Sequence, residues 1–244
     1  MCTSLRFLPS STTRDVQNVA VVASSSGRLW HWHATSGKCL GPRGGAPIVE
    51  DNENQIYALD VRGDGGSFAT AGFDGAVRVY DETTQKLSAT LTGGGDDGLY
   101  NNSYRGNPGV ESSIPGGGGG GGGAGGHTNR VFGVAYASKN RNVLVSGGWD
   151  NTLQIWDERC GGGAVRSIFG PHVCGDAIDI AGVDGGGEEI EGGGGTTEIL
   201  TGSWRDNNAL QVWDMGTGRL IQDVPFGALP GERNCQLYAV GTLL

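Results

Sequence analysis

The chain has 244 residues, 48 of them glycine, and a formal net charge of −9. Its lysines and arginines are scattered, which argues against nucleic-acid binding, because that depends on concentrated positive charge. No apolar run approaches the roughly 18 residues of a membrane helix, and the N-terminus lacks the apolar core of a signal peptide. We therefore expect a cytoplasmic protein without a membrane partner. It could be free or belong to a cytoskeletal or nuclear complex.

The first predicted unit, residues 2–40, sets a pattern that recurs along the chain. It has an alternating run, LRFLP, then two β-rich runs joined by a polar turn, VAVVASSSGRLWHWH, and then a short run, GKCL. Alternation predicts strands with one buried face, and the polar turn predicts a hairpin. The same order of four strands returns in three further units, residues 53–92, 127–170 and 172–226.

The end of the third strand gives the spacing of the units. It falls at His33, Asp81, Asp157 and Asp214, with gaps of 48, 76 and 57 residues. Glycine-rich insertions at 93–126 and 183–197 lengthen the last two gaps. Without their low-complexity residues, 93–126 and 184–195, the gaps shrink to about 42 and 45 residues. Neither insertion has the strand before it and the helix after it that a phosphate-binding loop needs, so we expect flexible linkers.

With this pattern and spacing, the chain resembles the WD-repeat (WD40-type) β-propeller family over nearly its whole length outside the glycine tracts. The resemblance implies an all-β propeller of four four-stranded blades in one domain, residues 1–244. It also implies a structural hydrogen-bonded tetrad of a His before the first strand, a Ser or Thr on the second, a turn Asp and a Trp on the third. The third unit matches all four positions, with His127, Ser146, Asp150 and Trp156.

The other units depart from this tetrad. The second has Thr70, Asp74 and Tyr80, with Asn52 near the His position. The fourth has His172, Thr201 and Trp213, and an extra residue leaves Asp206 or Asn207 as the turn acid. The first keeps only Trp32, so we expect the first blade to be the least rigid.

Residues 235–244 predict a partial fifth unit, because CQLYAVG matches NQIYALD at 54–60 position by position. Most WD propellers have seven blades, and propellers in general have about four to eight. Three explanations of the incomplete ring stay open: a truncated chain, closure with a second copy or a partner's blades, and tight closure alone. The second explanation predicts self-association through the open blade edges.

The resemblance implies a noncatalytic scaffold that binds other proteins, within a multiprotein complex, through the upper face of the propeller. In the family the residue before the turn Asp points outward on this face. The matching and neighbouring positions are Phe73, Arg130, Trp149, Trp204 and Arg205. Aromatic residues and Arg dominate binding energy on rigid surfaces, although these tryptophans could instead serve only as apolar cover between blades.

A propeller enzyme or metal-dependent hydrolase using central-channel residues is the alternative, and a truncated fragment without independent function is another. His31 and His33 share a strand face as two metal ligands would, but no third ligand stands nearby. Glu188, Glu189 and Glu191 predict a solvated loop. The five cysteines are scattered, with no CxxC pair. No catalytic motif is present, and we expect no catalytic residue, metal or cofactor.

Overall fold

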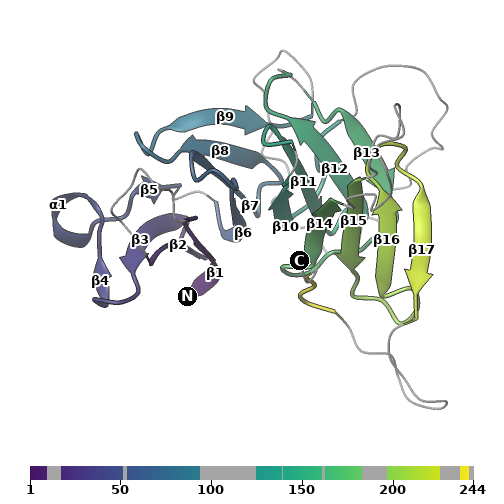
Figure 1. Cartoon of the computed structure of the whole chain (residues 1–244), viewed down its shortest axis with the longest axis horizontal. Coiled ribbons are helices and arrows are strands. Elements are labelled where there is room, and N and C mark those ends of the chain that lie inside the picture. The colour runs from purple at the N-terminus through teal and green to yellow at the C-terminus, as the bar shows by residue number, and fades with distance from the viewer. Residues whose placement is uncertain are drawn as a thin grey trace, which may run out of the picture.

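The computed structural model describes residues 1–9, 18–51, 54–93, 125–138, 140–160, 163–182, 197–225 and 237–241. Four antiparallel sheets follow one another along the chain as blades 1 to 4 of a propeller that does not close (Figure 1). The fold is therefore all-β, as the sequence predicts. No helix in these ranges is long and apolar enough to span a membrane.

Blade 1 is the most irregular of the four sheets. Its strands pair in chain order, and a fifth short strand pairs with the third. The short helix α1 (Pro42–Gly45), which the sequence pattern did not predict, links the fourth and fifth strands. The strands are β1 (Cys2–Phe7), β2 (Val19–Ser24), β3 (Arg28–His33), β4 (Lys38–Cys39) and β5 (Val49–Glu50).

Blades 2 to 4 each have four strands that pair in chain order. Blade 2 has β6 (Ile56–Val61), β7 (Ser67–Gly72), β8 (Val77–Asp81) and β9 (Leu87–Leu91). Blade 3 has β10 (Val131–Tyr136), β11 (Val143–Gly148), β12 (Thr152–Asp157) and β13 (Arg166–Phe169). Blade 4 has β14 (Ile178–Gly182), β15 (Thr197–Gly202), β16 (Leu210–Asp214) and β17 (Leu220–Val224).

The turn between the second and third strands has the same backbone feature in every blade. One residue there adopts a positive φ, which only Gly, and to a lesser extent Asn, adopts at low cost. The four residues are Gly27, Gly75, Asn151 and Asn208. We call the side of the propeller that carries these turns the upper face.

The hydrophobic core lies between the blades, not within one central cluster. Three clusters join blades 1 and 2, blades 2 and 3, and blades 3 and 4. Fully burying one large apolar side chain stabilises the fold by about 1.5–3 kcal/mol. Each blade thus depends on its neighbours, and representative residues of the three clusters are Leu29 with Phe68, Val79 with Trp156, and Leu153 with Trp213.

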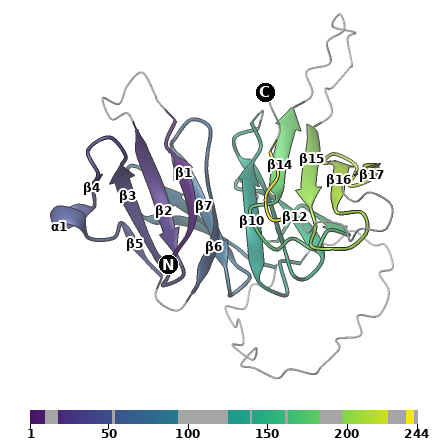
Figure 2. The same cartoon turned by 90° about the horizontal axis from the view of Figure 1, so that it is seen from below.

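A polar contact crosses the concave side of the arc. Arg6, on β1, donates from Nε to Asp60 of blade 2 at 3.3 Å and from Nη2 to Asp176, at the entry to blade 4, at 2.6 Å. Asp60 also accepts the backbone N–H of Tyr136, in blade 3, at 2.7 Å. One cluster therefore links all four blades. Figure 2 shows blades 1 and 2 together on one side of the molecule and blades 3 and 4 on the other.

The segment 237–241 lies against blade 4, where the first strand of a fifth blade would stand. Leu237 N–H lies 3.5 Å from the carbonyl of Ser203, and Val240 N–H lies 3.3 Å from that of Asp176. The described residues of this segment form no regular strand. The part of the chain that the structure describes supplies no second strand of a fifth blade for this segment to pair with, and a lone strand gains no ladder of hydrogen bonds.

Candidate functional site

One backbone hydrogen bond places the predicted binding residue on the upper face of each of blades 2 to 4. The N–H after the second strand donates to a carbonyl in the segment that precedes the first strand. The pairs are Phe73 to Gln55 at 2.9 Å, Trp149 to Arg130 at 3.0 Å, and Trp204 to His172 at 3.0 Å. Trp204 is therefore the counterpart of Trp149, and Arg205 follows it in the longer turn.

In blade 3 the four predicted tetrad residues are hydrogen-bonded to one another. His127 Nδ1 lies 2.8 Å from Asp150 Oδ2, and its Nε2 lies 2.7 Å from Ser146 Oγ. Trp156 Nε1 donates to the same Ser146 oxygen at 2.7 Å. Trp156, Ser146 and His127 are buried, so this network satisfies polar groups that would otherwise be costly inside the protein.

Asp150 joins this network to the turn. Burial alone would raise the pKa of its carboxyl, but the hydrogen bond and charge of His127 and the N–H of Thr128 lower it overall. The ionised carboxylate also accepts the backbone N–H of Thr152 at 3.1 Å. The turn that presents Trp149 is thus held on both sides, which limits the motion of that side chain.

The structure brings Phe73, Arg130 and Trp149 together in one stack across blades 2 and 3. The guanidinium carbon of Arg130 lies 4.5 Å from the ring centre of Phe73 and 5.3 Å from that of Trp149. Both distances are within the range of cation–π attraction. Phe73 is 40% exposed, so the stack reaches the solvent.

Aromatic residues that the sequence did not single out support this stack from below and beside it. Phe132 packs against Trp149 at 5.0 Å between ring centres and against Tyr57 at 4.7 Å. Trp149 is half-buried and donates from Nε1 to Cys174 Sγ at 3.0 Å. Tyr57 and Phe132 occupy matching places on β6 and β10, so the repeat alignment contained a signal for the pair.

Trp204 and Arg205 extend the same face into blade 4. Arg205 Nη2 donates to Asn151 Oδ1 at 3.0 Å, which connects the turns of blades 3 and 4. Trp204 is 37% exposed and lies 5.5 Å from Tyr238 of the C-terminal segment. We call Phe73, Arg130, Trp149, Trp204 and Arg205 the upper stripe.

With this geometry established, comparison with known proteins gives the family of the repeats. The model of the WD domain, G-beta repeat, matches residues 47–81 and 124–157, which belong to the second and third units. The chain contains WD40 repeats. The solved structure entitled "Structure of U3-55K" aligns with a TM-score of 0.55 at 15% identity, a likeness of fold.

That alignment covers 90% of this chain and 50% of the other, so the chain spans about half the length of that structure. No curated protein matches the sequence. The two WD40 units that the family model matches are the ones that carry Phe73, Arg130 and Trp149.

The WD40 unit of blade 2 replaces the tetrad histidine by a different arrangement. Arg78 Nη2 lies 2.5 Å from Asp74, and its Nε lies 3.4 Å from Asp51. The amide oxygen of Asn54 accepts the backbone N–H of Asp74 at 3.3 Å. The turn acid is thus held by Arg78, which the repeat pattern does not mark. Thr70 and Tyr80 are buried, and the predicted Asn52 lies outside the described residues.

In blade 4 the expected WD40 tetrad is reduced to a pair. Trp213 Nε1 donates to Thr201 Oγ1 at 3.0 Å, but the assignment of His172 to this tetrad does not hold. Its Nδ1 lies 2.9 Å from Asn151 Oδ1 of blade 3. The reason is that the N–H of Trp204 bonds the carbonyl of His172 as the N–H of Trp149 bonds that of Arg130, so His172 takes the place of Arg130 and not that of the tetrad histidine. Both candidate turn acids, Asp206 and Asn207, are exposed.

His172 instead supports the upper stripe. Its ring lies nearly parallel to Trp149, with 6.3 Å between the ring centres. Burial, and then the charge of Arg205, lower the pKa of His172 below its usual value. The neutral ring therefore donates its Nδ1 proton to the Asn151 amide oxygen, which also accepts from Arg205.

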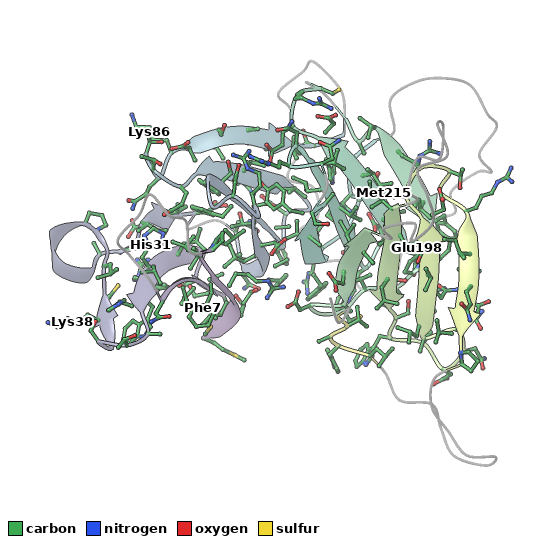
Figure 3. The ribbon with its side chains drawn as sticks, viewed as in Figure 1. Phe7, His31, Lys38, Lys86, Glu198 and Met215 are labelled. Atoms are coloured by element: carbon green, nitrogen blue, oxygen red, sulfur yellow. The ribbon has the colours of Figure 1, made fainter. Side chains whose placement is uncertain are left out.

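The two histidines considered as metal ligands have separate partners. His31, labelled in Figure 3, is buried, and its Nε2 lies 3.0 Å from Glu82 Oε2 of blade 2. His33 Nδ1 lies 2.6 Å from Ser36 Oγ. The described residues contain no group of three or more His, Cys, Asp or Glu that could hold a metal. The carboxylates at 188, 189 and 191 lie outside the described residues.

Proposed function

We propose that this chain is a noncatalytic platform that binds other proteins through the upper stripe of blades 2 to 4. The proposal rests on the stacking of Arg130 over both Phe73 and Trp149. Proteins with WD40 repeats typically mediate protein–protein interaction, and the two repeats that match the family model carry this stack.

The composition of the stripe favours a protein ligand. Arg and aromatic side chains are over-represented among residues that contribute most to protein interfaces. Here Arg130 is already ordered between two rings, and Arg205 is ordered by Asn151. Less side-chain entropy is therefore lost on binding, which raises the affinity that a given contact area provides.

A double variant, Phe73→Ala with Trp204→Ala, tests the proposal. These two aromatic rings are more exposed than Trp149, whose removal would also disturb Phe132 and Cys174. Tagged wild-type chain captures a partner from an extract, the partner is purified, and its dissociation constant is measured for each variant. We expect the double variant to bind at least about tenfold more weakly.

The matched control is Leu87→Ala, because Leu87 is 52% exposed but pairs with Tyr80, at the end of β8 opposite the upper-face turn. We expect it to bind as the wild type does. Thermal melts must show all three proteins folded. Equal affinity of the double variant and the wild type would contradict the proposed site.

The described side chains do not favour a metal-dependent hydrolase, since His31 contacts Glu82 and His33 contacts Ser36 instead of sharing one site. The cytoplasmic setting and membership of a multiprotein complex stay predictions.

A further inference from the structure

The two end blades carry outer faces that are counterparts of each other. In blades 2 to 4 the aromatic residue of the third strand packs against the preceding blade. Tyr80, Trp156 and Trp213 are consequently only 5%, 1% and 7% exposed. Trp32 holds the same ladder position in blade 1, opposite Ala20, yet it is 42% exposed.

Trp32 belongs to a continuous apolar face. Residues paired across an antiparallel ladder lie on the same side of the sheet. Phe7 and Trp32 both pair with Ala20, and Leu5 and Trp30 both pair with Val22. Phe7 and Leu5 are 58% and 43% exposed. This row, which we call the Trp32 face, looks away from blade 2, whereas Arg6 between them turns toward Asp60.

The interior of the molecule shows what covers such a face. Between blades 2 and 3, Trp156 shares a cluster with Ala69, Ala71, Val77 and Val79 of blade 2. Those four residues form two ladder pairs, Ala71 with Val77 and Ala69 with Val79. The aromatic residue of the third strand is therefore covered by small and branched residues on the second and third strands of the preceding blade.

Blade 4 has this covering surface on its outer side. The ladder pairs at the matching register are Gly202 with Leu210 and Leu200 with Val212. They alternate with Ile199 and Trp213, which pack toward blade 3, and Leu200, Leu210 and Val212 are only half-buried. We call this the Val212 face. Figure 3 labels Phe7 and Glu198 on the two blades that end the arc.

The segment 237–241 occupies one corner of the Val212 face. A Cβ on Gly202 would lie 2.9 Å from Val240 Cγ1 and 3.0 Å from Leu237 Cβ. The equivalent glycine of blade 3, Gly147, lies in the same way against Ile178 and Val173 of the next blade. The segment thus stands where an incoming first strand would pack.

We propose that two copies of this chain associate head to tail, with the Val212 face of one copy covering the Trp32 face of the other. Segment 237–241 is displaced from its corner as the partner's β1 enters. Each copy provides both faces, so two such contacts related by a twofold axis close a ring. The ring has eight blades, within the range of about four to eight that propellers adopt. This inference does not depend on ligand binding by the upper stripe.

The test is the mass of the full 244-residue chain in solution over a range of concentrations, measured by analytical ultracentrifugation. We expect wild type to form a dimer. Trp32→Asp places a charge in the centre of the contact and should weaken the dimer at least about tenfold. Phe7→Asp should act in the same direction. Phe169→Asp, an equally apolar and more exposed site on blade 3, should leave the dimer unchanged.

Two further variants distinguish this arrangement from other kinds of self-association. Val212→Asp should also give monomers, yet mixing it with Trp32→Asp should give a one-to-one heterodimer, because each variant keeps one intact face. A contact between two Trp32 faces would give no heterodimer. Leu237→Asp should form a tighter dimer than wild type, because the substitution releases segment 237–241 from Gly202 and uncovers the Val212 face.

Circular dichroism must show that the variants are folded. A wild-type chain that stays monomeric at every concentration would overturn the proposal. A Trp32→Asp protein that dimerises as wild type does, or a mixture without heterodimer, would also overturn it.

Discussion

The guanidinium of Arg6 lies 2.6 Å from the carboxylate of Asp176, although 170 residues separate them. The same guanidinium reaches Asp60, whose pKa is raised because burial outweighs the charge and hydrogen bonds that favour ionisation. The charge of Arg6 thus offsets part of the cost of burying the Asp60 carboxylate. The contact also links the first blade to the entry of the fourth.

Arg6→Ala should lower the free energy of unfolding by about 1–2 kcal/mol, because Asp60 loses its charged donor while part of the pair remains exposed to solvent screening. Urea denaturation measures the change. Arg159→Ala removes a solvent-exposed ion pair with Asp157 and serves as the control. If both variants unfold at the same urea concentration as wild type, Arg6 does not hold the arc.

Trp156→Phe should destabilise the protein by about 1–3 kcal/mol, because Ser146 loses a buried N–H donor and the indole leaves space behind. The control is Trp32→Phe, which changes an exposed indole at the same ladder position of blade 1. Thermal denaturation of the two variants at low protein concentration measures the difference. Equal melting temperatures would mean that the tetrad contributes little to stability.

The Asp150 carboxyl should make the stability depend on pH in acid. Its pKa is lower in the folded protein than its usual value, so its contribution is present above about pH 4 and is lost as the pH falls through the folded pKa. Asp150→Asn should therefore flatten the loss of unfolding free energy below about pH 4. Urea titrations at several pH values give the unfolding free energy of each protein. The prediction is contradicted if this free energy falls equally steeply with decreasing pH in the variant and in wild type.

Arg130→Lys should weaken partner binding about two- to fivefold, because an ammonium keeps the charge but loses the planar stacking on Phe73 and Trp149. The dissociation constant of the captured partner is the measurement. Arg141→Lys is the control, since Arg141 is exposed and contacts Asp64 near the opposite face. A stronger effect at Arg141 than at Arg130 would place the binding surface elsewhere.

The repeat pattern predicted the four blades because each strand alternates and each turn carries a residue suited to positive φ. It also predicted the residues of the blade 3 tetrad, which the structure joins by hydrogen bonds. These features depend on local sequence and on a spacing shared between units, so one sequence was enough to find them.

The missed features depend on side-chain contacts that the repeat spacing does not reveal. Arg78 replaces a histidine that would precede the first strand, and only the three-dimensional arrangement shows that its side chain reaches Asp74 and Asp51. His172 resembles a tetrad histidine in the sequence, but its carbonyl accepts the N–H of Trp204 as that of Arg130 accepts the N–H of Trp149, and only the fold shows this equivalence. The pair of Arg6 and Asp176 has no local signal at all.

Site-specific photo-crosslinking tests the proposed binding surface most directly. A photoreactive phenylalanine analogue replaces Phe73 in one sample and Leu87, at the opposite end of blade 2, in another, and each folded protein is irradiated with the purified partner. We predict a crosslinked complex from position 73 and none from position 87. Crosslinking from position 87 but not from position 73 would contradict binding through the upper stripe.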